Sequence, residues 1–122
     1  MTAKSLRITG WLGVVAIAVL SLVPGELRPQ ILVSNLLEHF AAYCATSFAL
    51  AFGYLGHTRV LPIALLLTIY AAILETAQLW VPGRASRIID FAAGSLGAWA
   101  GISLVLLFCA AHFKSNRTNG FE

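Results

Sequence analysis

The sequence predicts an all-α integral membrane protein, a four-helix antiparallel bundle. Apolar residues make up 59% of the 122 residues and charged residues only 11%, against roughly 25% charged residues in soluble domains. The charged residues lie mostly in short intervals between long apolar runs, which is the pattern of helices that cross hydrocarbon. Because this composition cannot build a water-soluble surface, we take lipid as the surroundings of the chain.

The first apolar run covers 8–23 and follows Lys4 and Arg7. Its length also fits a secretory signal peptide, but no cleavage pair of small residues ends it and three more apolar runs follow. We therefore expect a retained helix, whose flanking Lys and Arg side chains extend the span toward the membrane surface.

Three further apolar runs follow, over 36–55, 60–81 and 88–113. The link at 56–59 is so short that it requires a tight helical hairpin. Pro82 and Gly83 occupy the two central positions that a type II turn favours, so the chain reverses there. We expect a transmembrane domain over 1–113 and a polar cytoplasmic tail over 114–122.

Lys and Arg are unequally divided between the two sides of the predicted bundle, since four spans place both termini and the middle loop together. That side holds Lys4, Arg7, Arg59, Lys114 and Arg117, and the other side holds Arg28, Arg84 and Arg87. Cytoplasmic loops carry an excess of these residues. The division, five against three, predicts cytoplasmic termini and a location in the cell inner membrane.

Most ionisable residues of the membrane part come together on the outer side in this arrangement. The predicted site residues are Glu38, His39 and Tyr43 in the second helix, Glu75 and Gln78 in the third, Arg84 and Arg87 in the connecting turn, and Asp90 in the fourth. At about 100° per residue, those on helices share faces with small or polar residues. We therefore expect one cluster that faces the bundle interior.

Glu75 lies six residues before the end of its predicted helix at Val81. A carboxylate in the middle of a membrane costs at least ~2.5 kcal/mol on insertion scales, so such residues are usually functional or paired. Arg84 is the nearest candidate partner in the sequence, and its guanidinium suits two parallel hydrogen bonds to a carboxylate. A purely structural salt bridge that locks the bundle is the alternative interpretation of Glu75.

The other polar residues have structural interpretations too. The spacing of Asn35 and Glu38 has the form of a capping box, and Asp90 complements the positive end of a helix dipole. His39 also suits a hydrogen bond at the level of the lipid head groups, and Gln78 suits a hydrogen bond between helices. The arginines of the turn also suit anchoring to lipid phosphates.

Several classes of chemistry lack support in the sequence. The sequence has no basic cluster interleaved with aromatic residues, which is the pattern expected of a surface that binds a nucleic-acid backbone. Glu75, Asp90, Glu38 or His39 could hold a divalent cation, but no tight ligand motif is present, and no cofactor is expected. Cys44 lies one turn or more from His39 without a charged partner, so no activated nucleophile is evident. Whether the protein is an enzyme stays open.

Several ordered motifs resemble the VanZ-like membrane proteins. They are Ser21-Leu22 with Pro24, Glu38-His39-Phe40-Ala41-Ala42-Tyr43, Glu75-Thr76-Ala77-Gln78 with Val81-Pro82-Gly83-Arg84, and Asp90-Phe91-Ala92-Ala93-Gly94 with Gly97 and Gly101. Many relatives carry an Asp-Lys pair where this chain has Asn35-Leu36. The resemblance implies a multi-pass fold and a set of polar positions. The family that it indicates is linked to resistance to glycopeptide antibiotics, particularly teicoplanin.

The first functional hypothesis is a site for a lipid-linked or anionic amphiphile of the cell envelope. Arg84 and Arg87 would hold the head group, while Glu75 and Asp90 would orient them or act as acid and base. His39 would transfer a proton. The remaining substrate contacts would come from Gln78, Glu38 and Tyr43.

The second hypothesis is a small structural or accessory membrane protein, in which the same charges only form an internal network. The small-residue spacing of Gly97 and Gly101 would then dock a partner helix. Transport is disfavoured, because four spans alone make no pore and the charges stop near one interface. In each case membrane lipids are the expected surroundings and partners.

Overall fold

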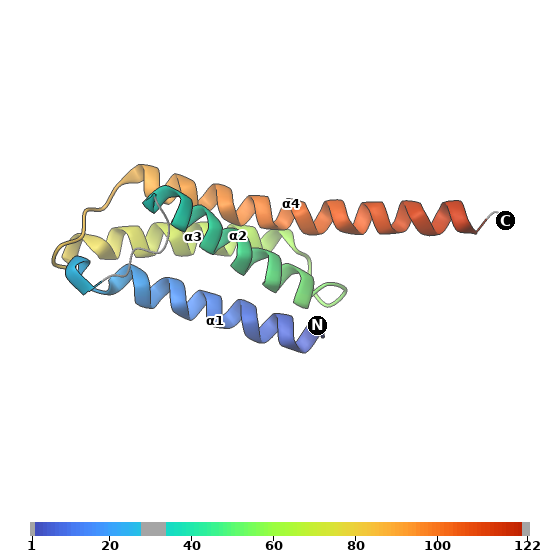
Figure 1. Cartoon of the computed structure of the whole chain (residues 1–122), viewed down its shortest axis with the longest axis horizontal. Helices are drawn as coiled ribbons and strands as arrows, with labels where there is room; N and C mark the ends of the chain where they lie inside the picture. Colours follow the sequence, from blue (N-terminus) through green and yellow to red (C-terminus); the bar gives the residue numbers. More distant parts are fainter. Residues whose placement is uncertain (1, 28–33, 121–122) are drawn as a thin grey trace.

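The computed structural model describes residues 2–27 and 34–120, and Arg28 of the predicted charge count lies outside them. Within these residues the chain forms four α-helices and no strand, which confirms the all-α class. The elements are α1 (Ala3–Leu22), η1 (Gly25–Leu27), α2 (Asn35–Gly53), α3 (Leu61–Ala77), η2 (Gln78–Trp80) and α4 (Ile88–Asn119). Successive α-helices run in opposite directions, as Figure 1 shows.

Among the described residues, three helical segments are long and apolar enough to cross a membrane: Ala3–Leu22, Leu61–Trp80 and Ile88–Asn119. The remaining helix, α2, is more polar because Asn35, Glu38 and His39 lie in its first turns. It lies between α1 and α4 (Figure 1), and both neighbours pack against it. The helix that carries Asn35, Glu38 and His39 therefore has an apolar helix on each side.

Glycines let the helices on either side of α2 approach it closely. A Cβ atom added to Gly97 or Gly101 of α4 would collide with the carbonyl oxygen of Phe40 or Cys44, respectively. On the other side, a Cβ at Gly13 of α1 would collide with the hydroxyl of Thr46. Close packing of this kind replaces the hydrophobic effect as the force that joins helices in lipid. The glycine stripe of α4 is thus filled by α2 of the same chain.

Side-chain hydrogen bonds connect the helices through the core. Ser47 Oγ donates to the carbonyl oxygen of Ala98 at 2.8 Å, which joins α2 to α4. The Tyr70 hydroxyl donates to the carbonyl oxygen of Val14 at 2.6 Å, which joins α3 to α1. These bonds satisfy polar groups that lipid cannot hydrate.

The link between α3 and α4 turns as expected. Gly83 has a φ of 73°, and the Arg84 amide donates to the carbonyl oxygen of Val81 at 3.3 Å. The Gly25 amide donates to the carbonyl oxygen of Pro82 at 3.1 Å, so the segments after α1 and after α3 touch.

The bundle has two ends that differ in composition. We call the end formed by the last turns of α1, the first turns of α2 and residues 75–90 the site end. The opposite end, with Arg7, the end of α2 and the start of α3, is called the Arg7 end. Beyond the Arg7 end, α4 continues alone (Figure 1) and is helical through the predicted polar tail as far as Asn119.

Candidate functional site

Glu75 supports the start of α4 from the side of α3. Only 8% of this residue is exposed, and its Oε1 atom accepts a hydrogen bond from the backbone amide of Arg87 at 2.7 Å. Arg87 is the N-cap residue of α4. Glu75 therefore satisfies a backbone donor and places negative charge near the positive end of a helix dipole. Its hydrogen-bond partner is this amide and not the expected side chain of Arg84.

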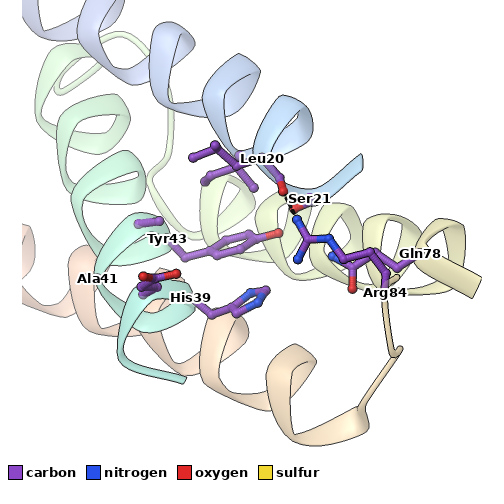
Figure 2. A pocket seen from close by; sticks show the side chains of 10 residues that line it. Leu20, Ser21, His39, Ala41, Tyr43, Gln78 and Arg84 are labelled. Atoms are coloured by element: carbon purple, nitrogen blue, oxygen red, sulfur yellow. Dashed lines mark hydrogen bonds between the residues drawn. The ribbon is translucent and has the colours of Figure 1, made fainter. Parts of the chain in front are cut away.

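Arg84 reaches across the bundle to the end of α1. Its Nε atom donates to the carbonyl oxygen of Val23 at 3.0 Å, and its Nη2 atom donates to the carbonyl oxygen of Leu20. Figure 2 shows this side chain directed toward α1. The last carbonyls of a helix have no partner within it, and a cation there is favourable. The turn at Gly83 thus directs Arg84 away from Glu75 and onto α1.

Arg87 and Asp90 form an ion pair at the start of α4. Arg87 Nη2 lies 3.1 Å from Asp90 Oδ1, and Arg87 Nε lies 3.3 Å from Asp90 Oδ2. The hydrogen bond to Asp90 and the attraction of its charge raise the pKa of Arg87. The Asp90 side chain is 7% exposed and that of Arg87 is 50% exposed. A buried carboxylate therefore holds a half-exposed cation in place.

The first turns of α2 differ from the capping interpretation of the sequence. Ser34 is the N-cap, and its side chain accepts from the Leu36 amide at 3.2 Å. Asn35 is already the first helical residue, so the capping box of Asn35 and Glu38 is wrong. Ser34 displaces Asn35 because its hydroxyl reaches the amide two residues on.

Two adjoining cavities lie at the site end. The first has a volume of about 350 Å³, lies between α1 and α2, and has the mainly apolar wall residues Ile17, Leu20, Ala41 and Ala42. The second has a volume of about 300 Å³ and a polar wall that includes Asn35, Arg87 and Asp90. Both cavities are lined by His39, Gln78 and Arg84. An apolar compartment and a polar compartment thus share one boundary.

The structure brings most of the predicted site residues to these cavities. Seven of the eight line at least one of them: Glu38, His39, Tyr43, Gln78, Arg84, Arg87 and Asp90. Glu75 lines neither of the two and acts on the site through the amide of Arg87. Within the described residues, no three His, Cys, Asp or Glu side chains are placed to hold a metal ion.

Ser21 is a cavity residue to which the sequence assigned no role. It lies in the last turns of α1, is 8% exposed and lines the first cavity. A single serine in an apolar run gives no indication of a site by itself. The one signal for Ser21 in the sequence was the motif Ser21-Leu22 with Pro24. This motif is among those that resemble the VanZ-like proteins.

Fold and site together define a helical membrane protein with a polar cavity at one end of its bundle. A family model described as VanZ/LLP1 matches residues 7–109. The match covers most of the chain, which therefore belongs to the VanZ/LLP1 family, and the resemblance seen in the sequence is confirmed. No curated protein and no solved structure matches the chain.

Proposed function

We propose that the protein binds the anionic head group of a lipid-linked cell-envelope amphiphile at the site end, with the apolar chain of the ligand between α1 and α2. The observation that carries this proposal is the shared boundary of an apolar and a polar cavity at His39, Gln78 and Arg84. The two cavities have volumes of about 350 and 300 Å³, which lie within the range of small-molecule sites. A divided site of this kind suits an amphiphile.

Entry from the bilayer is supported by the exposure of the apolar cavity wall. Leu20, Ala41 and Ala42 are all exposed, so lipid around the bundle would reach them. A ligand could therefore move in laterally with its chain still in hydrocarbon, so that only the head group changes its surroundings. A cell-envelope lipid also accords with the link of VanZ-like proteins to glycopeptide resistance.

The cations of the site supply the contacts for an anion. Arg87 is half-exposed beside the polar cavity, so its guanidinium has surface available for charge-assisted hydrogen bonds. Asp90 and Glu75 orient it, the first through its side chain and the second through its amide. His39 lines both cavities and is the residue suited to proton transfer. Acid or base catalysis by these three residues remains a prediction.

We also propose that both termini are cytoplasmic, which places the site end on the outer face of the inner membrane. The bias of Lys and Arg toward the terminal side supports this orientation. Cysteine variants at Ala85 and Ser115, made without Cys44 and Cys109, test it with a membrane-impermeant maleimide. Ala85→Cys should react in intact cells and Ser115→Cys only after permeabilisation. The reverse pattern would refute the orientation.

A structural or accessory role is the second candidate, and the contacts of Glu75 and Arg84 favour it. Both side chains join helix ends to each other. If every polar residue of the site end were used in this way, the cluster would need no ligand.

A binding experiment separates the two candidates. We would measure the affinity of the purified protein for dioleoyl phosphatidic acid and undecaprenyl phosphate by native mass spectrometry, with dioleoylglycerol and undecaprenol as uncharged controls. At least one phosphate lipid should bind about tenfold or more tightly than its uncharged counterpart. Arg87→Gln should remove this preference, and Arg117→Gln, on the projecting part of α4, should not. Equal binding of the charged and uncharged lipids would leave the structural role.

A further inference from the structure

Three neutral polar side chains line the apolar cavity without a hydrogen-bond partner among the described residues. They are Ser21, Tyr43 and Gln78, and they come from three different elements, α1, α2 and η2. Their exposed fractions are 8%, 3% and 2%, respectively, so each is more than nine-tenths buried. Their polar atoms open onto the cavity, since among the described residues only Ser95 Oγ is a fully buried side-chain atom without a hydrogen-bond partner. Polar groups of this kind are nearly always satisfied, by protein, water or a ligand.

The three side chains converge on one region. Figure 2 shows the Tyr43 hydroxyl directed from α2 toward Ser21 and the guanidinium of Arg84, with Gln78 beside Arg84. Gln78 also lines the polar cavity, so this region lies at the boundary between the two compartments. The polar atoms are therefore placed for a ligand that passes from one compartment to the other.

The hydrogen-bonding chemistry of this region favours an acceptor. Ser and Tyr hydroxyls and the Gln amide can all donate, and Arg84 can only donate. A group that accepts from several of them at once needs oxygen lone pairs. Carbonyl oxygens meet that requirement, whereas a hydrocarbon chain does not.

We propose that Ser21, Tyr43 and Gln78 bind the ester carbonyls of an acyl glycerophospholipid, which names the ligand class of the site and rests on the proposed function above. Ser21 and Tyr43 line the apolar cavity, Gln78 and Arg84 line both cavities, and Arg87 lines the polar cavity. A glycerophospholipid has the same order of groups: acyl chains, ester carbonyls, phosphate. In a polyprenyl phosphate the chain joins the phosphate directly, which would leave the neutral residues unpaired.

An ether analogue of the lipid tests this inference. We would compare dioleoyl phosphatidic acid, which has ester carbonyls, with the dioleyl ether lipid that has the same phosphate and chain length but no carbonyl. The ester should bind about tenfold more tightly, since the ether leaves buried donors unpaired. Tyr43→Phe and Gln78→Met should each reduce the ratio of the two affinities, mainly by weakening the ester. Tyr70→Phe is the matched control, because that hydroxyl is paired within the bundle.

The outcomes separate this inference from the proposed function. Equal binding of ester and ether, both tighter than dioleoylglycerol, would overturn the carbonyl assignment and keep the anion site. Tighter binding of undecaprenyl phosphate than of the ester lipid would do the same. An ester preference that Tyr43→Phe and Gln78→Met both leave unchanged would show that other residues recognise the carbonyls. No preference for phosphate in any lipid would remove the proposed function itself.

Discussion

The two ends of the bundle contain similar kinds of polar residue but use them differently. At the Arg7 end, Arg7 Nε donates to the carbonyl oxygen of Gly53 at 2.7 Å, and its guanidinium carbon lies 4.8 Å from the ring centroid of Tyr54. The hydroxyl of Tyr54 accepts in turn from Trp11 Nε1 at 2.9 Å. The site end instead retains buried polar side chains with no partner among the described residues.

One similarity between the ends shows which features do not mark a site. Arg7 donates to the end of α2 and Arg84 donates to the end of α1, so each arginine compensates the carbonyl end of a neighbouring helix. An arginine at a helix end is therefore no indication of a ligand in this protein. Buried polar groups that border a cavity and lack partners are a better indication, because nothing in the described chain accounts for them.

Glu75 is one of the paired side chains at the site end, and removing its carboxylate should have the largest effect on stability. Glu75→Leu leaves the Arg87 amide without its acceptor and should lower the free energy of unfolding by about 1–3 kcal/mol. Glu75→Gln keeps an acceptor and should lose less. Thermal unfolding in detergent measures both. A Glu75→Leu protein of normal stability that no longer binds lipid would instead place Glu75 in direct contact with the ligand.

Arg7→Met should produce the next largest effect, at the opposite end. The methionine keeps an apolar stem but loses the hydrogen bond to Gly53 and the contact with the Tyr54 ring, a loss of about 1–2 kcal/mol. Affinity for phosphatidic acid at the site end should not change. Lys4→Met is the control, since Lys4 is exposed and has no partner within residues 2–27 and 34–120. A fall in affinity with Arg7→Met would show that the two ends are not independent.

The helices were predictable from the sequence because lipid imposes a simple rule on their composition. Apolar runs located them, and Pro82-Gly83 located the reversal. The start of α1 was less predictable: the helix begins at Ala3, five residues before the apolar run at Ile8. Thr2 caps it by accepting from the Ser5 amide, and hydropathy carries no information about a polar first turn.

The sequence was enough to predict which residues lie near one another at the candidate site, but not which hydrogen bonds they form. Antiparallel threading was enough to bring Asp90, Gln78 and His39 together, since helix ends on one side must meet. The partner of Glu75 was not predictable, because it depends on the path of the turn, which directs one arginine side chain to α1 and a backbone amide to Glu75. Hydrogen-bond satisfaction depends on such local paths, and sequence spacing does not determine them.

A matched pair of tyrosine variants tests the comparison more directly. Tyr70→Phe removes a hydroxyl that donates to Val14 and should lower the free energy of unfolding by about 0.5–1.5 kcal/mol. Tyr43→Phe removes a hydroxyl without a partner among the described residues, so stability should stay equal or rise. Thermal unfolding without added lipid measures the difference. If both variants lose the same stability, the Tyr43 hydroxyl is already satisfied and its assignment to a ligand is wrong.

Arg87→Gln should have the smallest effect on stability and a large one on binding. The ion pair with Asp90 is half-exposed on the arginine side, and exposed ion pairs contribute little to folding. Glutamine can still donate a hydrogen bond to the buried carboxylate, so Asp90 keeps a donor although it loses the positive charge beside it. The melting temperature should therefore match that of the control Arg117→Gln, while affinity for phosphatidic acid falls only in Arg87→Gln. A fall in melting temperature as large as that of Tyr70→Phe would mean that Arg87, like Arg7 and Arg84, serves the bundle, and the site end would lose its most accessible cation.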